Sequence, residues 1–360
     1  MKRLASLTSA LALAATAASA QEVVNVYNWS DYVADDTISN FEEQSGIKVV
    51  YDVFDSNELL EAKMLTGASG YDVVFPSMEF LSRQAQAGVF AKIDKDALTN
   101  YGNLDPAVLA ITAQLDPDNA HAVPYMSYST GIGYNVEAIE ARLDADEIGS
   151  WDMLFKPETV AKLADCGVAI LDSPTEVIAP VLNWLGLDPN SEASGDLDQA
   201  VEVLKGMRPH VRYFHSSQYI NDLANGDICI TLGYSGDIMQ ARDRATEANQ
   251  PFTIAYTIPR EGAQIGFDMM AIPADAPHPE NAHAYINYIL QPEVAADITA
   301  AVYFANPNIP ATELVPDEVR NDPGIYPPEE VRAKMFAMKP HTPRFDRAAT
   351  RAWTSVKTGR

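Results

Sequence analysis

The chain has 360 residues and carries 50 acidic against 25 basic side chains, a formal net charge of −25. This length corresponds to roughly two domains. So acidic a chain repels nucleic acid and anionic membrane surfaces, so we expect neither as a partner.

The first twenty residues have the pattern of an export signal. Lys2 and Arg3 precede an apolar run over 4–17, and the small residues Ala18, Ser19 and Ala20 follow. We therefore predict a cleavable signal peptide at 1–20, cleaved next to Gln21, and a periplasmic mature protein. The apolar run is too short to span a membrane as a helix.

Two cysteines, Cys166 and Cys229, are present in the whole chain. In an exported protein two thiols favour a single disulfide. Cys166 precedes the predicted strand at 168–171 and Cys229 lies inside the one at 228–232, so a bond between them could join neighbouring strands. A catalytic thiol is the alternative interpretation.

Strand and helix patterns alternate along the chain, which predicts a largely parallel α/β architecture. Strands are predicted at 23–27, 47–54, 71–75, 168–171, 211–214, 228–232, 252–258 and 269–272. Helices are predicted at 35–44, 56–65, 79–87, 172–185, 197–206, 216–225, 236–246 and 280–290.

Two such α/β units with a cleft between them predict a hinged binding protein. The tracts 125–135 and 253–258 are interpreted as crossings between the units. Lobe 1 is accordingly predicted at 21–126 and 253–302, and lobe 2 at 127–252 and 303–360.

Aromatic residues stand near acids at three places that adjoin predicted strands. Trp29 lies near Asp31, Tyr234 near Asp237, and Phe267 beside Asp268. Ser77 and Glu176 also follow strands. In open α/β sheets ligands bind outside the carboxyl ends of strands. Because aromatic faces attract cations and carboxylates bind ammonium groups, these residues together predict a site for a small organic cation. Taken singly, each pair is better explained by core packing beside a helix cap, and only the set favours a binding site.

Common catalytic motifs are incomplete in this sequence. The GxG at 131–133 lacks the third glycine of a dinucleotide fingerprint. The GYSGD run at 233–237 approaches the GxSxG elbow of hydrolases, but Asp237 replaces the last glycine. The six histidines show no metal-ligand spacing. We therefore expect no enzyme activity, no metal and no cofactor, with an exported hydrolase using Ser235 as the rival from a different class.

Several long segments resemble the periplasmic polyamine-binding proteins of ABC importers. These are YNWSDY at 27–32, GIKVVYD at 46–52, TGIGYN at 130–135, YFHSSQYINDLANGDIC at 213–229 and PGIYPP at 323–328. The resemblance covers nearly the whole chain after residue 20 and is strongest to the putrescine-binding branch. It implies a two-lobed periplasmic binding protein of type II, each lobe a mixed, mostly parallel sheet flanked by helices, with a hinged cleft.

The resemblance also implies the ligand set. A diamine would lie between aromatic rings while acids and hydroxyls hold its ammonium ends. The matching positions are Trp29, Ser30, Asp31, Tyr32, Ser77, Glu176, Tyr234, Asp237, Phe267 and Asp268. It further implies a disulfide between Cys166 and Cys229, and a monomer that meets the permease subunits of an importer.

Four positions differ from the putrescine pattern. Tyr234 replaces a Trp, Phe304 replaces a Tyr, Gly266 replaces a ring, and Glu79 replaces a Ser that is Tyr in spermidine binders. Phe304 and Glu79 are still predicted to contact ligand. The exchanges at Gly266 and Glu79 predict a larger box with a third anchoring carboxylate.

The predicted function is therefore capture of a polyamine in the cleft and its delivery to an importer. Putrescine is the first candidate, with spermidine and cadaverine as alternatives. A binder of another small cation or of a sugar on the same fold remains open. An amino-acid binder would need a cation opposite the ligand carboxylate, and no Arg adjoins these motifs.

Overall fold

The computed structural model describes residues 21–359, so the predicted signal peptide lies outside the described part. Within that part, ten strands form a sheet in the order β2-β1-β3-β9-β4-β7-β5-β6, with β10 paired to β9 and β8 to β4. The strands are β1 Val23–Trp29, β2 Lys48–Phe54, β3 Val73–Val74, β4 Ala122–Asn135, β5 Val168–Ile170, β6 Tyr213–Phe214, β7 Ile230–Tyr234, β8 Ile254–Thr257, β9 Gln264–Ala271 and β10 Phe336–Ala337.

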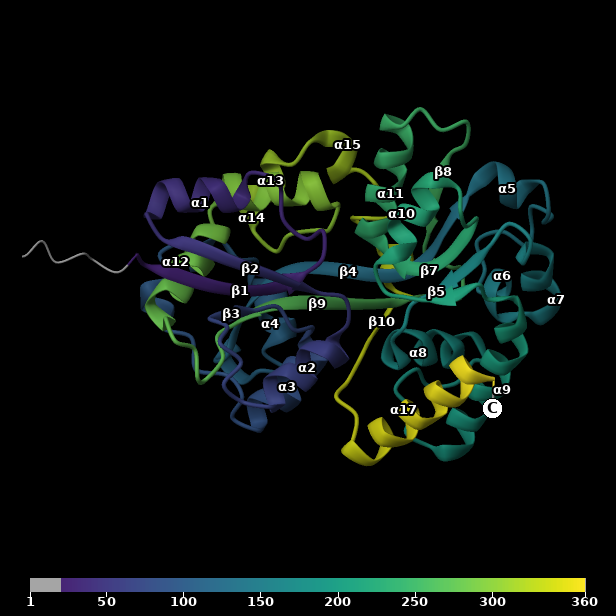
Figure 1. The fold of residues 1–360 in the computed structure, drawn as a ribbon, viewed down its shortest axis with the longest axis horizontal. Helices are drawn as coiled ribbons and strands as arrows, with labels where there is room; N and C mark the ends of the chain where they lie inside the picture. The colour runs from purple at the N-terminus through teal and green to yellow at the C-terminus, as the bar shows by residue number, and fades with distance from the viewer. Residues whose placement is uncertain (1–20, 360) are drawn as a thin grey trace, which may run out of the picture.

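Helices cover both faces of this sheet (Figure 1). They are α1 Thr37–Ser45, α2 Asn57–Leu65, α3 Met78–Gln86, α4 Pro106–Thr112, α5 Val136–Glu140, α6 Asp152–Phe155, α7 Pro157–Val160, α8 Pro174–Trp184, α9 Ser194–Met207, α10 Gln218–Asn225, α11 Ser235–Glu247, α12 Pro279–Ile289, α13 Pro292–Val302, α14 Ile309–Leu314, α15 Asp317–Arg320, α16 Glu329–Arg332 and α17 Pro343–Thr358. Across residues 21–359, none of them has both the length and the apolar character that crossing a membrane requires.

The molecule has two lobes joined by two long strands. We call the part built on β1, β2 and β3 lobe 1, and the part built on β5, β6 and β7 lobe 2; Figure 1 shows them at the left and right, with β4 and β9 extending between them. Within each lobe the three named strands run parallel, whereas β9 and β4 join them in antiparallel pairs. The predicted two-lobed α/β fold with mixed sheets is confirmed.

Local sequence explains why these elements form where they do. Alternate residues of β1 are fully buried at Val24 and Val26 while their neighbours are half-exposed, as expected for a strand with two different faces. Ser56 caps α2 and Ser173 caps α8, each by accepting a backbone N–H from the first turn. Gly226 ends α10 in the left-handed conformation that glycine adopts without steric cost.

The strand β4 belongs to both lobes. Its first part, from Ala122 to Ser129, pairs with β9, and its second part pairs with β7 and β8. The strand that accompanies β4 between the lobes is therefore β9, whereas the tract 253–258, interpreted from sequence as a crossing, contains β8 beside the far end of β4. The residue limits of the lobes given from sequence stay a prediction.

A disulfide joins Cys166 to Cys229, with 5.4 Å between their Cα atoms. The two residues precede β5 and β7, which are adjacent parallel strands of lobe 2. The predicted bond between neighbouring strands is thus present. It ties together chain segments 63 residues apart, and closing so long a loop restricts the unfolded chain.

We predict that exported protein shows no free thiol when titrated under denaturing, non-reducing conditions. Replacing both cysteines by alanine should lower the free energy of unfolding by about 2–4 kcal/mol, measured by urea denaturation, because the unfolded chain regains its freedom. Two titratable thiols in the exported wild-type protein would contradict the assignment.

Candidate functional site

A pocket with about 390 Å³ of free space, partly open to solvent, lies between the two lobes. Its walls carry both rings and acids, and the lining residues are Trp29, Ser30, Tyr32, Asp55, Ser77, Tyr128, Ser216, Tyr234, Asp237, Asp268 and Phe304. A ring-lined pocket with a few convergent polar groups is typical of a small-molecule site.

Strand ends bring most of these side chains together. Trp29 is the last residue of β1, Ser77 follows β3, and Tyr234 is the last residue of β7. Asp237 lies in the first turn of α11, directly after β7, so the helix N-terminus faces the pocket with it. The carboxyl ends of the parallel strands of the two lobes therefore face the same cavity, as expected for open α/β sheets.

Asp268 is the most completely hydrogen-bonded acid of the pocket. The Tyr32 hydroxyl donates to its Oδ2 at 2.8 Å and the Ser77 hydroxyl to its Oδ1 at 2.6 Å. Asn57 in turn donates to Ser77 Oγ at 2.9 Å, which orients the serine. Burial nevertheless raises the pKa of Asp268 to about 7, against the lowering effect of the two hydroxyls.

Asp237 stands in a similar environment in lobe 2. The Tyr219 hydroxyl donates to its Oδ2 at 2.5 Å, and the same hydroxyl accepts the backbone N–H of Tyr234. Burial raises the pKa of Asp237 to about 7, and the negative charges of Asp31 and Asp268 add to the shift. Each lobe thus contributes one buried carboxyl group whose ionised form lacks a positive partner within the pocket.

Aromatic rings from both lobes surround the acids. Trp29 of lobe 1 and Tyr234 of lobe 2 meet edge to face, with 6.1 Å between ring centroids. Tyr128 meets Tyr234 in the same manner at 5.6 Å, and Tyr32 meets Phe304 at 4.9 Å. The Trp29 indole is fixed by its bond from Nε1 to the Phe75 carbonyl, 2.8 Å long.

The charge of the pocket selects the class of ligand. Asp55, Asp237 and Asp268 are acidic, and none of the pocket residues within the described part of the chain is Lys, Arg or His. A cation would compensate the buried carboxylates, whereas an anion or a zwitterion would place a carboxylate against them. The pocket is therefore suited to a cation with hydrocarbon between its charges.

Asp31 is a predicted ligand residue that the structure does not bring to the pocket. Its carboxylate pairs with Arg244 of α11 at 2.7 Å, and Gln240 donates to its backbone carbonyl at 3.2 Å. Asp31 lies two residues after the end of β1 with a positive φ of 54°, and its pair with Arg244 holds its side chain at the rim. It connects the lobes outside the cavity.

Three further predicted residues do not line the pocket. Phe267 lies between Gly266 and Asp268 on β9, so its ring projects to the opposite face of the strand, against the core. Glu79 and Glu176 are buried behind the pocket wall, only 5% and 2% exposed. Burial raises the pKa of Glu79 to about 7 and that of Glu176 well above its usual range.

The expectation that Gly266 leaves extra room is wrong. A Cβ atom at Gly266 would lie 2.3 Å from the Tyr128 ring, so that ring already occupies the space. Tyr128 reaches this place from β4, which pairs directly with Gly266 on β9. The Tyr128 ring thus fills the space beside Gly266.

Asp55, Tyr128 and Ser216 line the pocket but were not predicted. Asp55 directly follows β2 and Ser216 lies two residues after β6, so the rule about strand ends would have found both. Tyr128 lies in the middle of the long strand β4, and no local sequence signal distinguishes it from a core tyrosine.

Comparisons with known proteins show the family to which this chain belongs. A family model described as bacterial extracellular solute-binding protein matches residues 36–327. The putrescine-binding periplasmic protein PotF of Escherichia coli is 53% identical over 96% of this chain and 94% of its own. The putrescine-binding periplasmic protein SpuD of Pseudomonas aeruginosa is 50% identical over 100% of this chain and 98% of its own.

A solved structure shares the architecture. The spermidine/putrescine ABC transporter substrate-binding protein PotD from Streptococcus pneumoniae superposes with a TM-score of 0.74 at 26% identity, covering 94% of this chain and 99% of that one.

We predict that the unliganded cleft opens as the pH rises. Asp237 and Asp268 keep their protons in the closed cleft below about pH 7, whereas hydrated carboxyls lose them near pH 4. A raised pKa favours the closed form: the preference is fully present below about pH 4 and is lost progressively as the pH rises from there to about 7. A three-unit shift corresponds to ~4 kcal/mol per acid.

Small-angle X-ray scattering should therefore give a larger radius of gyration at about pH 8.5 than at about pH 5.5. A variant with both Asp237→Asn and Asp268→Asn should show the same radius at both values, since its amides do not titrate. Equal radii for the wild-type protein would contradict the prediction.

Proposed function

Because the chain belongs to the bacterial extracellular solute-binding protein family, we propose that it captures a polyamine between its lobes and delivers it to an ABC importer. Putrescine is the first candidate, with spermidine and cadaverine as alternatives, since the two relatives described above are named for putrescine. The observation that supports the proposal most is the pair of buried carboxyls, Asp237 and Asp268, in a ring-walled pocket.

The pocket chemistry matches a linear diamine. One ammonium group would take the place of the proton on Asp268 and the other would pair with the Asp237 carboxylate. The hydrocarbon chain between them would pack against Trp29 and Tyr234. Ring contacts contribute about 0.5–2 kcal/mol each and charge-assisted hydrogen bonds about 1.5–3 kcal/mol each. After the cost of association, these contacts correspond to micromolar or tighter binding.

Ligand capture would shift the lobes toward the closed form, because only the closed cleft offers both acids to one molecule. The ion pair between Asp31 and Arg244 joins the lobes at the rim of the pocket and would form in the same step. The closed protein then presents both lobes to the permease subunits in the inner membrane. In this proposal the protein acts in the periplasm as a monomer, after removal of residues 1–20.

The proposed activity is binding without chemistry. Ser235, the nucleophile that the incomplete elbow motif suggests, is 3% exposed at the start of α11, and its Oγ accepts the backbone N–H of Ser129 at 3.3 Å. The hydroxyl therefore stabilises the contact between α11 and β4. The first experiment below distinguishes a polyamine binder from a binder of a sugar or of another cation, and from a hydrolase.

We predict that putrescine raises the melting temperature while neutral sugars, zwitterionic amino acids and n-butylamine do not. n-Butylamine is the matched control because it has the same carbon chain with one ammonium group. At a putrescine concentration 100 times its dissociation constant, the stabilisation should be about 2.7 kcal/mol. Equal stabilisation by a sugar, or none by any polyamine, would refute the proposal.

We also predict that Asp268→Asn and Asp237→Asn each weaken putrescine binding by at least ~1.5 kcal/mol, roughly tenfold, in calorimetry. The amide keeps the shape but removes the ionic partner. Asp222→Asn is the matched control, because Asp222 also accepts a tyrosine hydroxyl, from Tyr213 at 2.7 Å, but lies outside the pocket. Unchanged affinity in both pocket variants would make these acids structural.

A further inference from the structure

A second ion pair joins the lobes, away from the one between Asp31 and Arg244. Arg83 of α3 in lobe 1 binds Asp346 of α17 through Nη1 at 3.2 Å. Figure 1 shows α3 and α17 on one side of the sheet and α11, which carries Arg244, on the other. Neither Arg83 nor Asp346 is among the residues that line the main pocket. The new pair therefore joins the lobes at a distance from the proposed ligand.

Helix α17 is fixed to lobe 2. It packs against α8 and α9. Near its end, the Trp353 indole and the Lys357 ammonium group both bind the Asp172 carboxylate, at 2.8 Å and 2.6 Å. The backbone N–H of Asp172 in turn donates to the hydroxyl of Ser216, a residue of the main pocket, at 3.1 Å. The helix is thus tied to the wall that lobe 2 contributes to the pocket.

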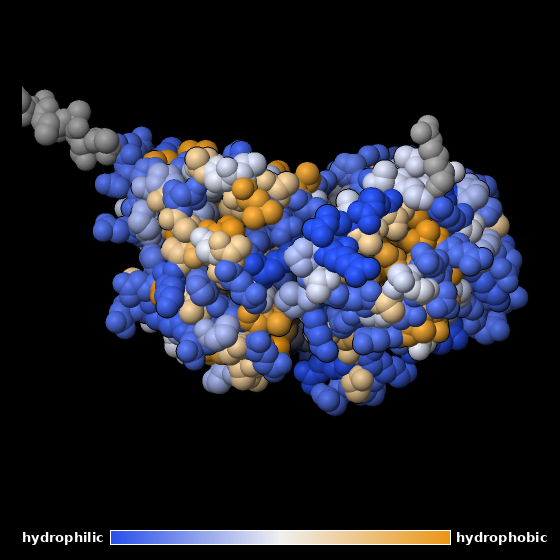
Figure 2. Space-filling view, turned by 90° about the horizontal axis from the view of Figure 1, so that it is seen from below, coloured by the Kyte–Doolittle hydropathy of each residue, from blue (hydrophilic) through white to orange (hydrophobic). Residues whose placement is uncertain are grey.

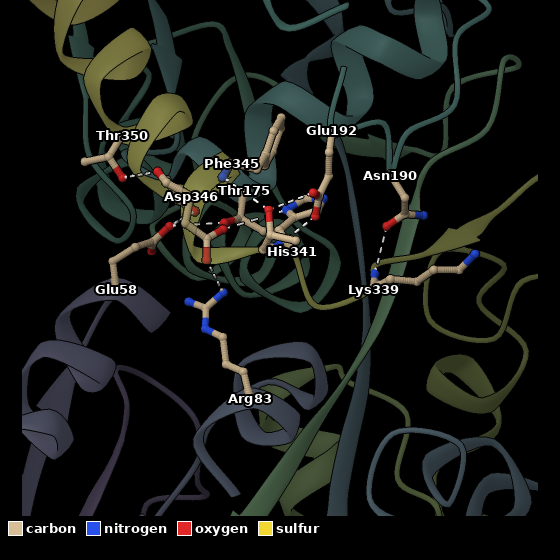
Figure 3. A network of polar contacts seen from close by, with 12 residues as sticks. Glu58, Arg83, Thr175, Asn190, Glu192, Lys339, His341, Phe345, Asp346 and Thr350 are labelled. Carbon is tan, nitrogen blue, oxygen red and sulfur yellow. Dashed lines mark hydrogen bonds and ion pairs between the residues drawn. The ribbon is translucent and has the colours of Figure 1, made fainter. Parts of the chain in front are cut away.

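The start of α17 is held at the same lobe. Thr342 caps the helix, and its backbone N–H and hydroxyl donate to Glu192, between α8 and α9, at 2.6 Å and 2.7 Å. Figure 3 shows Glu192 beside this turn and Asp346 pointing toward the Arg83 guanidinium. Asp346 is therefore held by lobe 2 in a position that faces lobe 1.

Lobe 1 orients Arg83 for this contact. Its Nε and Nη2 bind the two carboxylate oxygens of Glu61 on α2 at 2.7 Å each, a geometry that fixes the plane of the guanidinium. The guanidinium also lies over the Phe80 ring, 4.0 Å from the ring centroid. Its Nη1 is left to bind Asp346 across the junction. Because each partner is held by its own lobe, little side-chain freedom is lost when the pair forms.

Arg83 is the cation between two acids of opposite lobes. The side chains of Arg83, Glu61 and Asp346 are 23%, 21% and 34% exposed, so solvent screens their charges only in part. Burial raises the pKa of Asp346, the charge of Arg83 opposes this shift, and the charge of Glu61 adds to it. The neighbouring Arg347 has a weaker effect. Without Arg83, closure would therefore bring two carboxylates together across the junction, which is costly.

His341 does not replace this cation. Its Nδ1 lies 3.9 Å from Oδ1 of Asp346 and its ring packs on Phe345, with 4.5 Å between the ring centroids. Burial lowers the pKa of His341, so the ring is neutral at pH 7. The attraction across the junction at this place thus depends on Arg83.

Open space surrounds the contact. Figure 2 shows this side of the molecule, with hydrophilic residues along the line where the lobes meet and a hollow between them. A cavity with about 520 Å³ of free space lies at this part of the junction, and Glu61, Arg83 and Asp346 are among the residues of both lobes that line it. The ion pair therefore bridges a gap between the lobes.

We propose that Arg83 is a positioning residue that sets how readily the cleft closes, because it binds Asp346 only when the lobes are together. Arg83, Glu61 and Asp346 are called the clasp below. The inference rests on the proposed function, since closure over a polyamine is the step that the clasp favours. On opening, the pair with Glu61 stays within lobe 1 and only the bond to Asp346 breaks. Ligand enters the open form, so the clasp slows ligand release and leaves association unchanged.

The test measures putrescine binding by calorimetry and its association and release rates by stopped-flow tryptophan fluorescence. Arg83→Gln should raise the dissociation constant and the release rate about three- to fivefold, the range of a partly exposed ion pair. The association rate should stay within about twofold of wild type. Adding Asp346→Asn to Arg83→Gln should return both raised values to within about twofold of wild type, since the repulsion with Glu61 is then removed. A general loss of packing would give no such recovery.

Arg142→Gln is the matched control. Arg142 binds Asp165 through Nε and Nη2, at 3.1 Å and 2.9 Å, but both residues lie in lobe 2. Its putrescine dissociation constant should stay within about twofold of wild type. Arg83→Lys keeps the charge but lacks the planar fork that reaches both acids, so its release rate should lie between those of wild type and Arg83→Gln. The melting temperature of each unliganded variant reports correct folding.

Three results would overturn the inference. One is an unchanged release rate in Arg83→Gln while putrescine still binds, and another is a raised rate that Asp346→Asn does not reduce; both leave the proposed function intact. The third is an equal loss of affinity in Arg142→Gln. If no polyamine binds the wild-type protein, the proposed function fails and this inference fails with it.

Discussion

The structure is organised around carboxyl groups that are buried where the lobes meet. Four of them, Asp237, Asp268, Glu79 and Glu176, are at most 8% exposed, and burial raises the pKa of each. A closed cleft without ligand therefore keeps these acids protonated or opens to hydrate them, since an ionised carboxylate in a dry interior is costly. A ligand with several positive charges removes this conflict, so its charge, more than its shape, drives closure.

The fold brings these acids together from distant parts of the chain. Tyr32 donates to Asp268 across 236 residues of sequence, and Thr130 donates to Glu176 across 46. Both contacts depend on β4 and β9, because these two paired strands extend from lobe 1 to lobe 2 and join the lobes. Helix N-termini then carry Asp237, Glu79 and Glu176 to the junction, where the helix dipoles partly stabilise their ionised forms.

The parts of the fold and the site that local sequence patterns determine could be predicted. Trp29, Ser77 and Tyr234 were predicted because each ends or follows a strand, and the two-lobed α/β fold followed from alternating strands and helices. Tyr128 was missed and the room at Gly266 was overestimated for one reason: the ring of one strand fills the space over its partner, and strand pairing is not a local property. Whether a side chain faces the pocket is not a local property either. For Phe267 it depends on the strand register of β9, and for Asp31 on a turn of the backbone.

The strand β4 loses its regular register with β9 between Pro124 and Met126. Pro124 has no backbone N–H to donate, and an irregularity of this kind lets a strand bend without breaking the pairs on either side. The irregularity lies within lobe 1, because Val74 and Ser77 pair with β9 on either side of it. Beyond it β4 and β9 continue toward lobe 2 as a single pair of strands. Bending such a two-stranded connection would not break its pairs, so the speed with which the protein releases its cargo would be set by the contacts across the junction and not by the sheet that joins the lobes.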